Sequence, residues 1–376
     1  MKDLLELREE IDGIDKQIVD LYEKRMQISE QVANYKIENH RPVFDKARET
    51  SKLETLAALA HNPFNRHGIT ELFEQIMAMS RKKQYQLLAE NGMSAKPDFI
   101  PVEKFDFENA RIVFQGVEGA YSQQAMKEYF GETCDGYNVD TWRDAMEEIK
   151  CGRADYAVLP IENSSAGIVS ENYDLLVEYD NYIVGEQILR INHALLGTKD
   201  ATIDDISTVY SHPQALMQCA AYLEEHRNWD RISLKNTALS AKKVSDEGKK
   251  NQAAIASYKT AEIYDLQVLK DAIQDNKSNS TRFIIVAGQP VYAKNASKIS
   301  ICFEIPHESG SLYHMLSHFI YNDINMTNIQ SRPIQGRNWE YRFFVDFEGN
   351  FEDTAVQNAL RGLSEETTAM KILGTY

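Results

Sequence analysis

A heptad repeat of apolar residues runs through the first part of the chain and is interrupted once, by an arginine. The two seam positions carry Leu4, Ile11, Ile18 and Val32, and Leu7, Ile14, Leu21, Ile28 and Tyr35. Arg25 stands where the first series would carry another aliphatic residue. A guanidinium group cannot shed its proton, so a buried one needs an anion beside it, unless the side chain extends past its neighbours into solvent. The pattern predicts a long helix whose seam holds either a partner carboxylate that sets the register or a bound ligand.

The helix predicted over about residues 3–39 would be roughly 55 Å long, which a domain of residues 1–90 cannot cover by itself. We therefore expect a second copy of the chain to bury the seam. Arg25 and Lys36 would point within about 20° of each other and lie roughly 16 Å apart along the axis, where both can reach one small dianion. Arg8 would lie about 26 Å from Arg25 on another face, so we expect it to act in the site of a partner copy.

Composition and charge limit the function classes. A chain of 376 residues, with 43% hydrophobic and 26% charged residues, is typical of a globular protein of two or three domains. The formal net charge of −16, with no basic block, argues against nonspecific binding to nucleic acids or anionic membranes. Because no apolar run reaches the roughly 20 residues of a membrane span and the chain starts with a charged amphipathic segment, we expect a cytoplasmic protein.

The cysteines carry no metal or disulfide signature. Cys134, Cys151, Cys219 and Cys302 are dispersed, without a CxxC pair or a His/Cys cluster at metal-ligand spacing. We expect reduced thiols, no metal and no organic cofactor.

The pattern of periodicity divides the chain into an all-α part, a linker and an α/β part. Residues 1–90 read as helices separated by a break at His40-Arg41-Pro42 and a turn at His61-Asn62-Pro63. Residues 91–109 lose periodicity and contain Pro97 and Pro101, which suits an extended linker. Over residues 110–290 short apolar strands alternate with helices, which predicts an α/β domain.

The last segment, residues 297–376, has a different order of elements. It reads strand, helix, strand, strand, helix, strand. This order is the split βαβ, ferredoxin-like arrangement, so we expect a third, α+β domain.

The polar residues of the first domain carry a family resemblance. Arg8, Arg25, Lys36, the segment 41–49 and the Ser80/Gln84 pair resemble the all-helical chorismate mutase domain, a dimer. The resemblance implies that the carboxylates and the ether oxygen of chorismate are held by Arg25, Lys36, Arg48 and, from the other copy, Arg8. It implies hydrogen bonds from Asp45, Glu49, Ser80 and Gln84, with Glu49 on the substrate hydroxyl and Gln84 on the ether oxygen. Lys36 and Gln84 would be the catalytic residues. A pericyclic rearrangement suits such a site because it needs positioning and electrostatic stabilisation rather than a nucleophile.

Polar segments follow several predicted strands of the α/β domain, where open sheets place their ligands. They are residues 116–122, 160–167, 211–214 with Gln218, and 280–283. Together they resemble prephenate dehydratase, a two-lobed fold around a cleft, like a periplasmic binding protein. The resemblance implies that Thr281 protonates the leaving hydroxyl. It implies substrate contacts from Asn163, Ser211, Gln218, Thr281, Arg282 and Phe283, with Arg282 as the cation.

The C-terminal domain resembles the ACT module, which senses small molecules in amino-acid pathways. The matching positions are Ser309, Gly310, Ser311 and Leu312, and Gln330, Ser331, Arg332 and Pro333. Two of them depart from the pattern, because the family has alanine at 311 and glutamate at 330. Gln330 removes a carboxylate that could pair with Arg332 or with a ligand ammonium group. The resemblance implies L-phenylalanine as effector, and a dimerisation module without a ligand is the alternative.

The resemblance covers nearly the whole chain in one order: mutase, linker, dehydratase, ACT. It implies a bifunctional enzyme of phenylalanine biosynthesis that converts chorismate through prephenate to phenylpyruvate, as a homodimer or higher oligomer. Two alternatives stay open: a dehydratase that prefers arogenate, and a ligand-sensing protein with a degenerate mutase domain.

Overall fold

Three helices form the N-terminal part of the computed structural model, which describes residues 2–92 and 98–376. They are α1 (Leu4–Glu38), α2 (Lys46–Ala57) and α3 (Pro63–Glu90). The side chains of Asp3, Asp45 and Asn62 each accept a hydrogen bond from a backbone N–H of the first turn, which explains where the helices begin. The all-helical prediction for this part is confirmed, including the breaks before α2 and α3.

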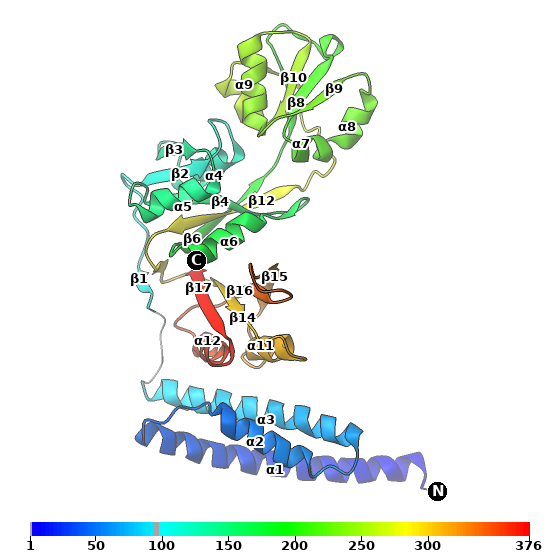
Figure 1. Cartoon of the computed structure of the whole chain (residues 1–376), viewed down its shortest axis with the longest axis vertical. Coiled ribbons are helices and arrows are strands. Elements are labelled where there is room, and N and C mark those ends of the chain that lie inside the picture. Colours follow the sequence, from blue (N-terminus) through cyan, green and yellow to red (C-terminus); the bar gives the residue numbers. More distant parts are fainter. Residues whose placement is uncertain (1, 93–97) are drawn as a thin grey trace.

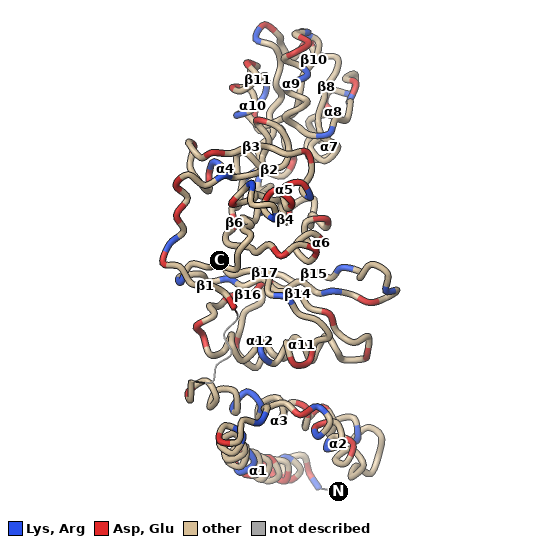
Figure 2. The backbone as a smooth tube through the Cα atoms, turned by 60° about the vertical axis from the view of Figure 1, so that its left-hand side comes forward, with Lys and Arg blue, Asp and Glu red and all other residues tan. Residues whose placement is uncertain are grey.

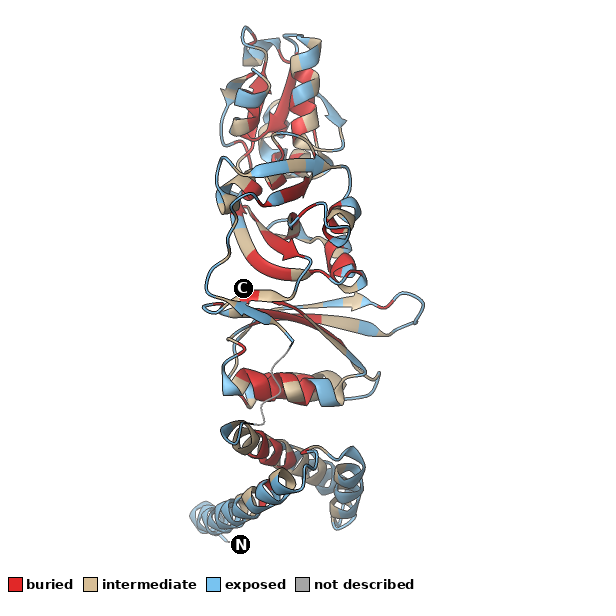
Figure 3. Cartoon of the chain, turned by 90° about the vertical axis from the view of Figure 1, so that its left-hand side faces the viewer, coloured by how far each residue is buried: buried red, intermediate tan, exposed pale blue. Residues whose placement is uncertain are grey.

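The heptad seam of α1 is exposed in the single chain. Its apolar side chains range from 41% exposed at Val32 to 66% at Leu21, and Figure 3 shows most of α1 as exposed. The buried residues of α1 are Ser29 and Ala33, which lie on the side toward α3. Arg25 is not part of the exposed seam, because its side chain turns toward α3.

The linker predicted over residues 91–109 is partly a strand. Residues 93–97, including Pro97, lie outside the described residues. The strand β1 (Ile100–Val102) pairs in parallel with β13 (Val291–Ala293), and the backbone N–H of Ile100 donates to the Pro290 carbonyl at 2.7 Å. The sequence does not predict this strand because it contains Pro101, and proline has no backbone N–H to donate to a neighbouring strand.

The α/β part has two lobes, and the first is built on a mixed sheet in the order β3-β2-β4-β12-β6. Its strands are β2 (Arg111–Gln115), β3 (Asp135–Val139), β4 (Tyr156–Asn163), β6 (Tyr182–Arg190) and β12 (Ser280–Ala287), with the short β5 (Gly167–Ile168) beside β4. Its helices are α4 (Tyr121–Phe130), α5 (Trp142–Lys150) and α6 (Ser170–Glu178). Residues of α5 and α6 form a core on one face of the sheet, and residues of α4 form a core on the other.

The second lobe has its own five-stranded sheet in the order β11-β7-β10-β8-β9. The strands are β7 (Ala194–Gly197), β8 (Thr208–Ser211), β9 (Asp230–Ser233), β10 (Gln252–Ala256) and β11 (Gln267–Lys270). The helices are α7 (Pro213–Gln218), α8 (Ala220–Glu225), α9 (Thr237–Glu247) and α10 (Tyr258–Ile263), with a 3₁₀ turn at Ile203–Asp205. The chain enters this lobe after β6 and leaves it before β12, so these two strands connect the lobes.

The C-terminal part has the predicted order of elements. It contains β14 (Lys298–Glu304), α11 (Ser311–Ile320), β15 (Met326–Pro333), β16 (Tyr341–Glu348), α12 (Thr354–Glu366) and β17 (Ala369–Thr375). Its strand order, β15-β16-β14-β17, is that of a split βαβ unit. At its edge β17 pairs with β6, with Gly374 opposite Ile183, so this sheet continues into the first lobe.

The C-terminal part lies between the N-terminal helices and the two lobes (Figure 1). It therefore contacts both neighbours, although it comes last in the sequence. Acidic and basic residues are interspersed along residues 2–92 and 98–376 (Figure 2). Among residues 2–92 and 98–376, no helix combines the length and the apolar character that crossing a bilayer requires.

Candidate functional site

The first polar cluster lies between α1 and α3. The Arg25 guanidinium donates from Nη1 to Ser80 Oγ at 2.5 Å. Farther along α1, Lys36 Nζ donates to Gln84 Oε1 at 3.1 Å and to the Val43 carbonyl at 2.5 Å. Ser80 and Gln84 are one helical turn apart on α3, so they present one face to the two cations. The structure thus brings four of the predicted mutase residues together.

The two cations of this cluster are half-buried. Burial lowers the pKa of Arg25 and of Lys36, and in both cases the charge of Glu49 opposes that shift. The Lys36 ammonium has three N–H groups, of which two are used by Val43 and Gln84. One donor is therefore left for an anionic ligand.

The other predicted mutase residues make no side-chain contact with this cluster among the described residues. Asp45 is the N-cap of α2 and accepts from the Arg48 backbone N–H at 3.0 Å. The Glu49 carboxylate forms an ion pair with Arg81. The side chains of Arg48 and Arg8 are exposed, and Arg8 lies near the N-terminal end of α1, far along that helix from Arg25.

Arg81 was not predicted as a site residue. It is only 9% exposed, stacks on the Phe44 ring at 5.0 Å from the ring centroid, and pairs with two carboxylates, Glu49 and Glu366. Nothing local marks it in the sequence, because Arg81 is followed by Lys82 and Lys83 and reads as part of a solvated basic run.

The second polar cluster joins the two lobes of the α/β part. Thr281, at the start of β12, is 9% exposed, and its Oγ1 accepts a hydrogen bond from Asn163 Nδ2 at 2.9 Å. Asn163 Nδ2 is also 2.9 Å from Asn279 Oδ1. From the second lobe, Gln218 Nε2 donates to Asn163 Oδ1 at 3.4 Å. The cluster therefore holds three of the predicted dehydratase residues, one of them from the opposite lobe.

Two further residues, which were not predicted as site residues, extend this cluster. His193 lies between β6 and β7, where the chain crosses between lobes, and its Nε2 is 3.0 Å from Gln218 Oε1. Its Nδ1 is 3.0 Å from the Tyr121 hydroxyl, which also donates to the Asn192 carbonyl at 2.8 Å. Burial lowers the pKa of His193, and the Gln218 hydrogen bond opposes this shift only in part. The sequence feature that could have indicated His193 is a histidine between two apolar segments, which become β6 and β7.

The Asn279 amide has a donor to spare. This residue is 1% exposed, and its Nδ2 makes no hydrogen bond within the part of the chain that the structure describes. A buried donor without a partner is costly, so its position beside Asn163 and Thr281 favours a site that a polar ligand completes.

Two other predicted dehydratase residues are packed into the protein. Ser211 is fully buried on β8, where its hydroxyl donates to the Ile255 carbonyl at 2.6 Å. Phe283 is 2% exposed and belongs to the core between the first-lobe sheet and α4. Their side chains support the walls of the two lobes. His212, which was not nominated, caps α7 by accepting from the Gln214 N–H at 3.1 Å.

Arg282 lies apart from the Thr281 cluster, so its role as the substrate cation stays a prediction. Successive side chains of a strand point to opposite faces, so Arg282 points away from the lobes' junction toward the C-terminal part. Its Nη2 is 2.8 Å from Asp346 Oδ2, and Nη1 is 3.4 Å from Glu186 Oε2. Three carboxylates, those of Glu162, Glu186 and Asp346, compensate its charge, and the guanidinium is held in an interdomain contact.

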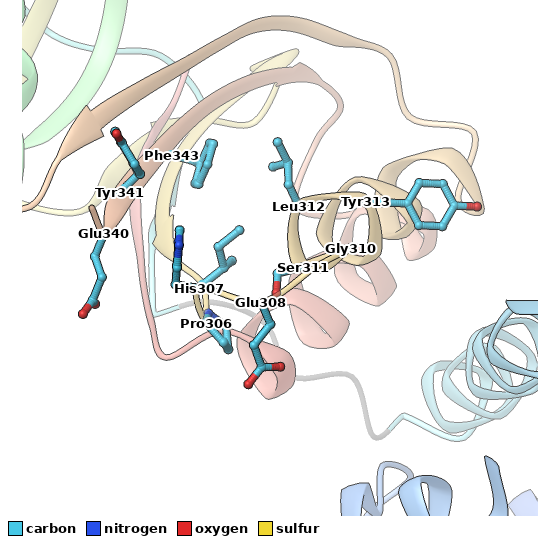
Figure 4. Close-up of a pocket in the computed structure, with 11 residues that line it drawn as sticks. Pro306, His307, Glu308, Gly310, Ser311, Leu312, Tyr313, Glu340, Tyr341 and Phe343 are labelled. Carbon is cyan, nitrogen blue, oxygen red and sulfur yellow. The ribbon is translucent and has the colours of Figure 1, made fainter. Parts of the chain in front are cut away.

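The C-terminal part has a small cavity at the start of α11. Its volume is about 190 Å³, and its lining includes Gly310, Ser311, Leu312 and Phe343. Figure 4 shows that the lining residues come from the loop before α11, its first turn and the start of β16. Three of the predicted regulatory residues thus meet at one cavity, and Ser309 lines a larger cleft of about 670 Å³ toward α2 and α3.

The second predicted regulatory segment is placed elsewhere, on the edge strand β15. Arg332 Nη2 pairs with Asp174 Oδ2 of α6 at 2.6 Å, and Gln330 Nε2 donates to Asn328 Oδ1 at 3.3 Å. Gln330 and Arg332 do not line the cavity at α11, nor do Ser331 and Pro333. A carboxylate of the first lobe is therefore the partner of Arg332.

Two family models match separate parts of the chain. The chorismate mutase type II model matches residues 7–85, which contain the first cluster, and the prephenate dehydratase model matches residues 112–291, which contain the second.

Similar proteins are found by sequence and by structure. A bifunctional chorismate mutase/prephenate dehydratase of Escherichia coli (strain K12) is 33% identical over 380 residues, covering 99% of this chain and 96% of the relative. A prephenate dehydratase from Arthrobacter aurescens, solved in complex with L-Phe, is 29% identical with a TM-score of 0.66, covering 71% of this chain and 89% of that one. A structure described as a novel type of quorum quenching acylase is 31% identical with a TM-score of 0.65, covering 71% of this chain and 97% of that one.

Proposed function

Because this chain belongs to the family of bifunctional chorismate mutase/prephenate dehydratases, we propose how its two polar clusters divide the two reactions. The enzyme converts chorismate to prephenate and then prephenate to phenylpyruvate, carbon dioxide and water, in phenylalanine biosynthesis. This function is supported by the presence of a chorismate mutase segment and a prephenate dehydratase segment in one chain, and by relatives with the same organisation over nearly their full length. The structural likeness to an acylase does not select between activities, because a prephenate dehydratase covers the same share of this chain, 71%, with a similar TM-score.

We propose that the α1–α3 cluster is the mutase site. In this reaction the ether C–O bond breaks while a C–C bond forms, and no proton moves, so the protein has to hold a compact conformer and stabilise charge on the ether oxygen. Arg25 and Lys36 supply the cations for the substrate carboxylates, and Lys36 and Gln84 supply donors for the ether oxygen. Ser80 orients Arg25, and Glu49 accepts the substrate hydroxyl.

Arg8, Arg48 and Asp45 complete this proposed site in a dimer. The exposed apolar seam of α1 is the surface that we propose a second copy covers, which brings the second copy's Arg8 to the cluster. In residues 2–92 the buried hydrophobic side chains are only Ala33, Val43, Met77 and Tyr85. So small a core supports the need for a partner.

We propose that the cluster between the lobes is the dehydratase site. Aromatisation drives this reaction: the ring C–carboxylate bond breaks, its electron pair forms the last ring double bond, and the 4-hydroxyl leaves with a proton. Thr281 is the proposed donor of that proton. Because its oxygen already accepts from Asn163, its own O–H is free to point at the substrate and is polarised toward donation. Gln218 and the spare Asn279 donor supply hydrogen bonds for a carboxylate.

For regulation, we propose that the C-terminal part is an ACT module that binds L-phenylalanine near the cavity at α11. Gly310, Ser311 and Leu312 line that cavity, whose volume of about 190 Å³ suits a small ligand. The complex of the Arthrobacter aurescens dehydratase with L-Phe supports an effector of this kind. We propose domain boundaries at 1–90, 110–290 and 297–376.

The test follows the two reactions by ultraviolet absorbance. Purified protein given chorismate is expected to consume it and then to form phenylpyruvate. Loss of chorismate without phenylpyruvate would restrict the activity to the first domain, and absence of both signals would favour the ligand-sensing alternative. Comparing turnover of prephenate and arogenate decides the substrate, since faster turnover of arogenate would contradict the assignment.

A further inference from the structure

The N-terminal helices and the C-terminal part meet at a polar interface, with Arg81 of α3 at its centre. Arg81 Nη2 is 2.9 Å from Glu366 Oε1 at the end of α12, and Nη1 pairs with Glu49 of α2. One guanidinium thus joins a carboxylate of the mutase cluster to a carboxylate of another domain. Both carboxylates line the cleft of about 670 Å³ between these domains.

The surroundings of Arg81 hold its side chain in one orientation. The Phe44 ring covers one face of the guanidinium, and the side chain is 11% exposed. His318 Nε2 of α11 lies 3.3 Å from the same Glu366 oxygen. Burial would lower the pKa of Arg81, but the charges of Glu49 and Glu366 outweigh it and raise that pKa. The geometry and the charges both describe a closed ion-pair network rather than a surface contact.

Further contacts keep the two domains in register around this network. Tyr85 of α3 donates to Glu365, the neighbour of Glu366. At the other end of the interface Gln75 Nε2 donates to the Tyr313 hydroxyl at 3.3 Å. A shift of α12 relative to α3 would therefore have to break the Glu366 contact.

We propose that Arg81 is a positioning residue of the mutase reaction: it holds the Glu49 carboxylate toward the α1–α3 cluster, and Glu366 of the C-terminal domain holds Arg81 in turn. Arg81 itself does not touch the substrate. Without it, the Glu49 carboxylate would be free to rotate away from the α1–α3 cluster, and its hydrogen bond to the substrate hydroxyl would weaken. The C-terminal domain is then a structural requirement for full mutase activity. This inference rests on the proposed role of Glu49.

The experiment measures both activities of the full-length protein, because the dehydratase rate reports whether each variant is folded. Arg81→Ala is expected to lower mutase kcat/KM about tenfold, a loss of about 1.4 kcal/mol, mainly through KM, with dehydratase unchanged. Arg81→Lys is expected to recover part of this loss. Glu366→Gln is expected to lower mutase kcat/KM severalfold. Lys83→Ala is the matched control, because Lys83 lies on the same helix and pairs with Glu30 at a half-exposed site.

The double variant decides whether Arg81 acts through Glu49. If it does, Arg81→Ala combined with Glu49→Gln is no slower than Glu49→Gln alone, whereas independent effects multiply. Multiplied losses, or an Arg81→Ala mutase equal to wild type, would overturn the proposal. If Arg81→Ala lowers both activities, Glu366→Gln is used as the test variant instead. A wild-type mutase rate in Glu366→Gln would then overturn the proposal as well. If Glu49→Gln alone leaves the mutase rate unchanged, the proposed role of Glu49 in the mutase site is wrong, and the proposal for Arg81 is wrong with it.

Discussion

Thr281 and Arg282 are neighbours on β12, yet their side chains serve opposite faces of the sheet. Thr281 Oγ1 is 2.9 Å from Asn163 Nδ2 at the junction of the lobes, whereas Arg282 Nη2 is 2.8 Å from Asp346 Oδ2 in the C-terminal part. The same strand thus carries the proposed proton donor and the main ion pair to the adjacent domain. Each residue can be tested separately because its partners differ.

We expect Asp346→Asn to act on stability rather than on substrate binding. Removing one partner of a buried ion pair leaves a charge uncompensated and costs roughly 3–5 kcal/mol. Glu186 remains near Arg282 and reduces this cost. Urea unfolding of the full-length protein measures the loss, and the KM for prephenate should stay within about twofold. A large increase in KM at unchanged stability would instead place Arg282 at the substrate.

Asn163 provides a test of the hydrogen bond to Thr281. Asn163→Asp keeps the size of the side chain but replaces the donating amide with an acceptor, so Thr281 would turn its proton to the carboxylate. We expect dehydratase kcat to fall by about 10²-fold or more, with the mutase rate unchanged as an internal control. A dehydratase of normal rate in this variant would mean that Thr281 does not depend on Asn163.

The buried His193 predicts a dependence of stability on pH. Its pKa in the folded protein is lowered from the usual 6.5. Between the folded-state pKa and about pH 6.5, the folded state therefore binds fewer protons than the unfolded state. The resulting stability is fully present above about pH 6.5 and is lost as the pH falls toward the folded-state pKa. Urea midpoints at pH 5.5 and 7.5 should therefore differ less in His193→Gln than in wild type. Equal pH sensitivity of the two proteins would contradict this assignment.

The shared mutase site predicts complementation between inactive variants. Mixing Arg8→Ala with Arg25→Ala protein should restore part of the mutase activity, because a mixed dimer contains one site without either substitution. As a control, Ile14→Glu on the exposed seam of α1 is added to both variants. This substitution should prevent dimers, so mixing the two proteins should restore no mutase activity. Absence of recovery in the first mixture, despite confirmed subunit exchange, would reject a site built from two copies.

Much of this architecture could be predicted because its signals are local. The heptad, the break before Pro42 and Pro63 at the first position of α3 define the helices, and the alternation of strands and helices defines the lobes. The position of the C-terminal part depends on contacts distant in sequence, such as Arg81 with Glu366 and Arg332 with Asp174, for which no periodicity exists. Strand alternation alone predicts that Thr281 and Arg282 point to opposite faces of β12, whereas the family motif groups them in one site.

A time course with Thr281→Ala tests whether one chain performs both reactions at separate sites. Wild-type protein and the variant are given chorismate, and chorismate, prephenate and phenylpyruvate are measured together. We expect equal rates of chorismate loss, with phenylpyruvate formed by the wild type and prephenate accumulating in the variant. Phenylpyruvate formation at the wild-type rate by Thr281→Ala, or no consumption of chorismate by either protein, would contradict it.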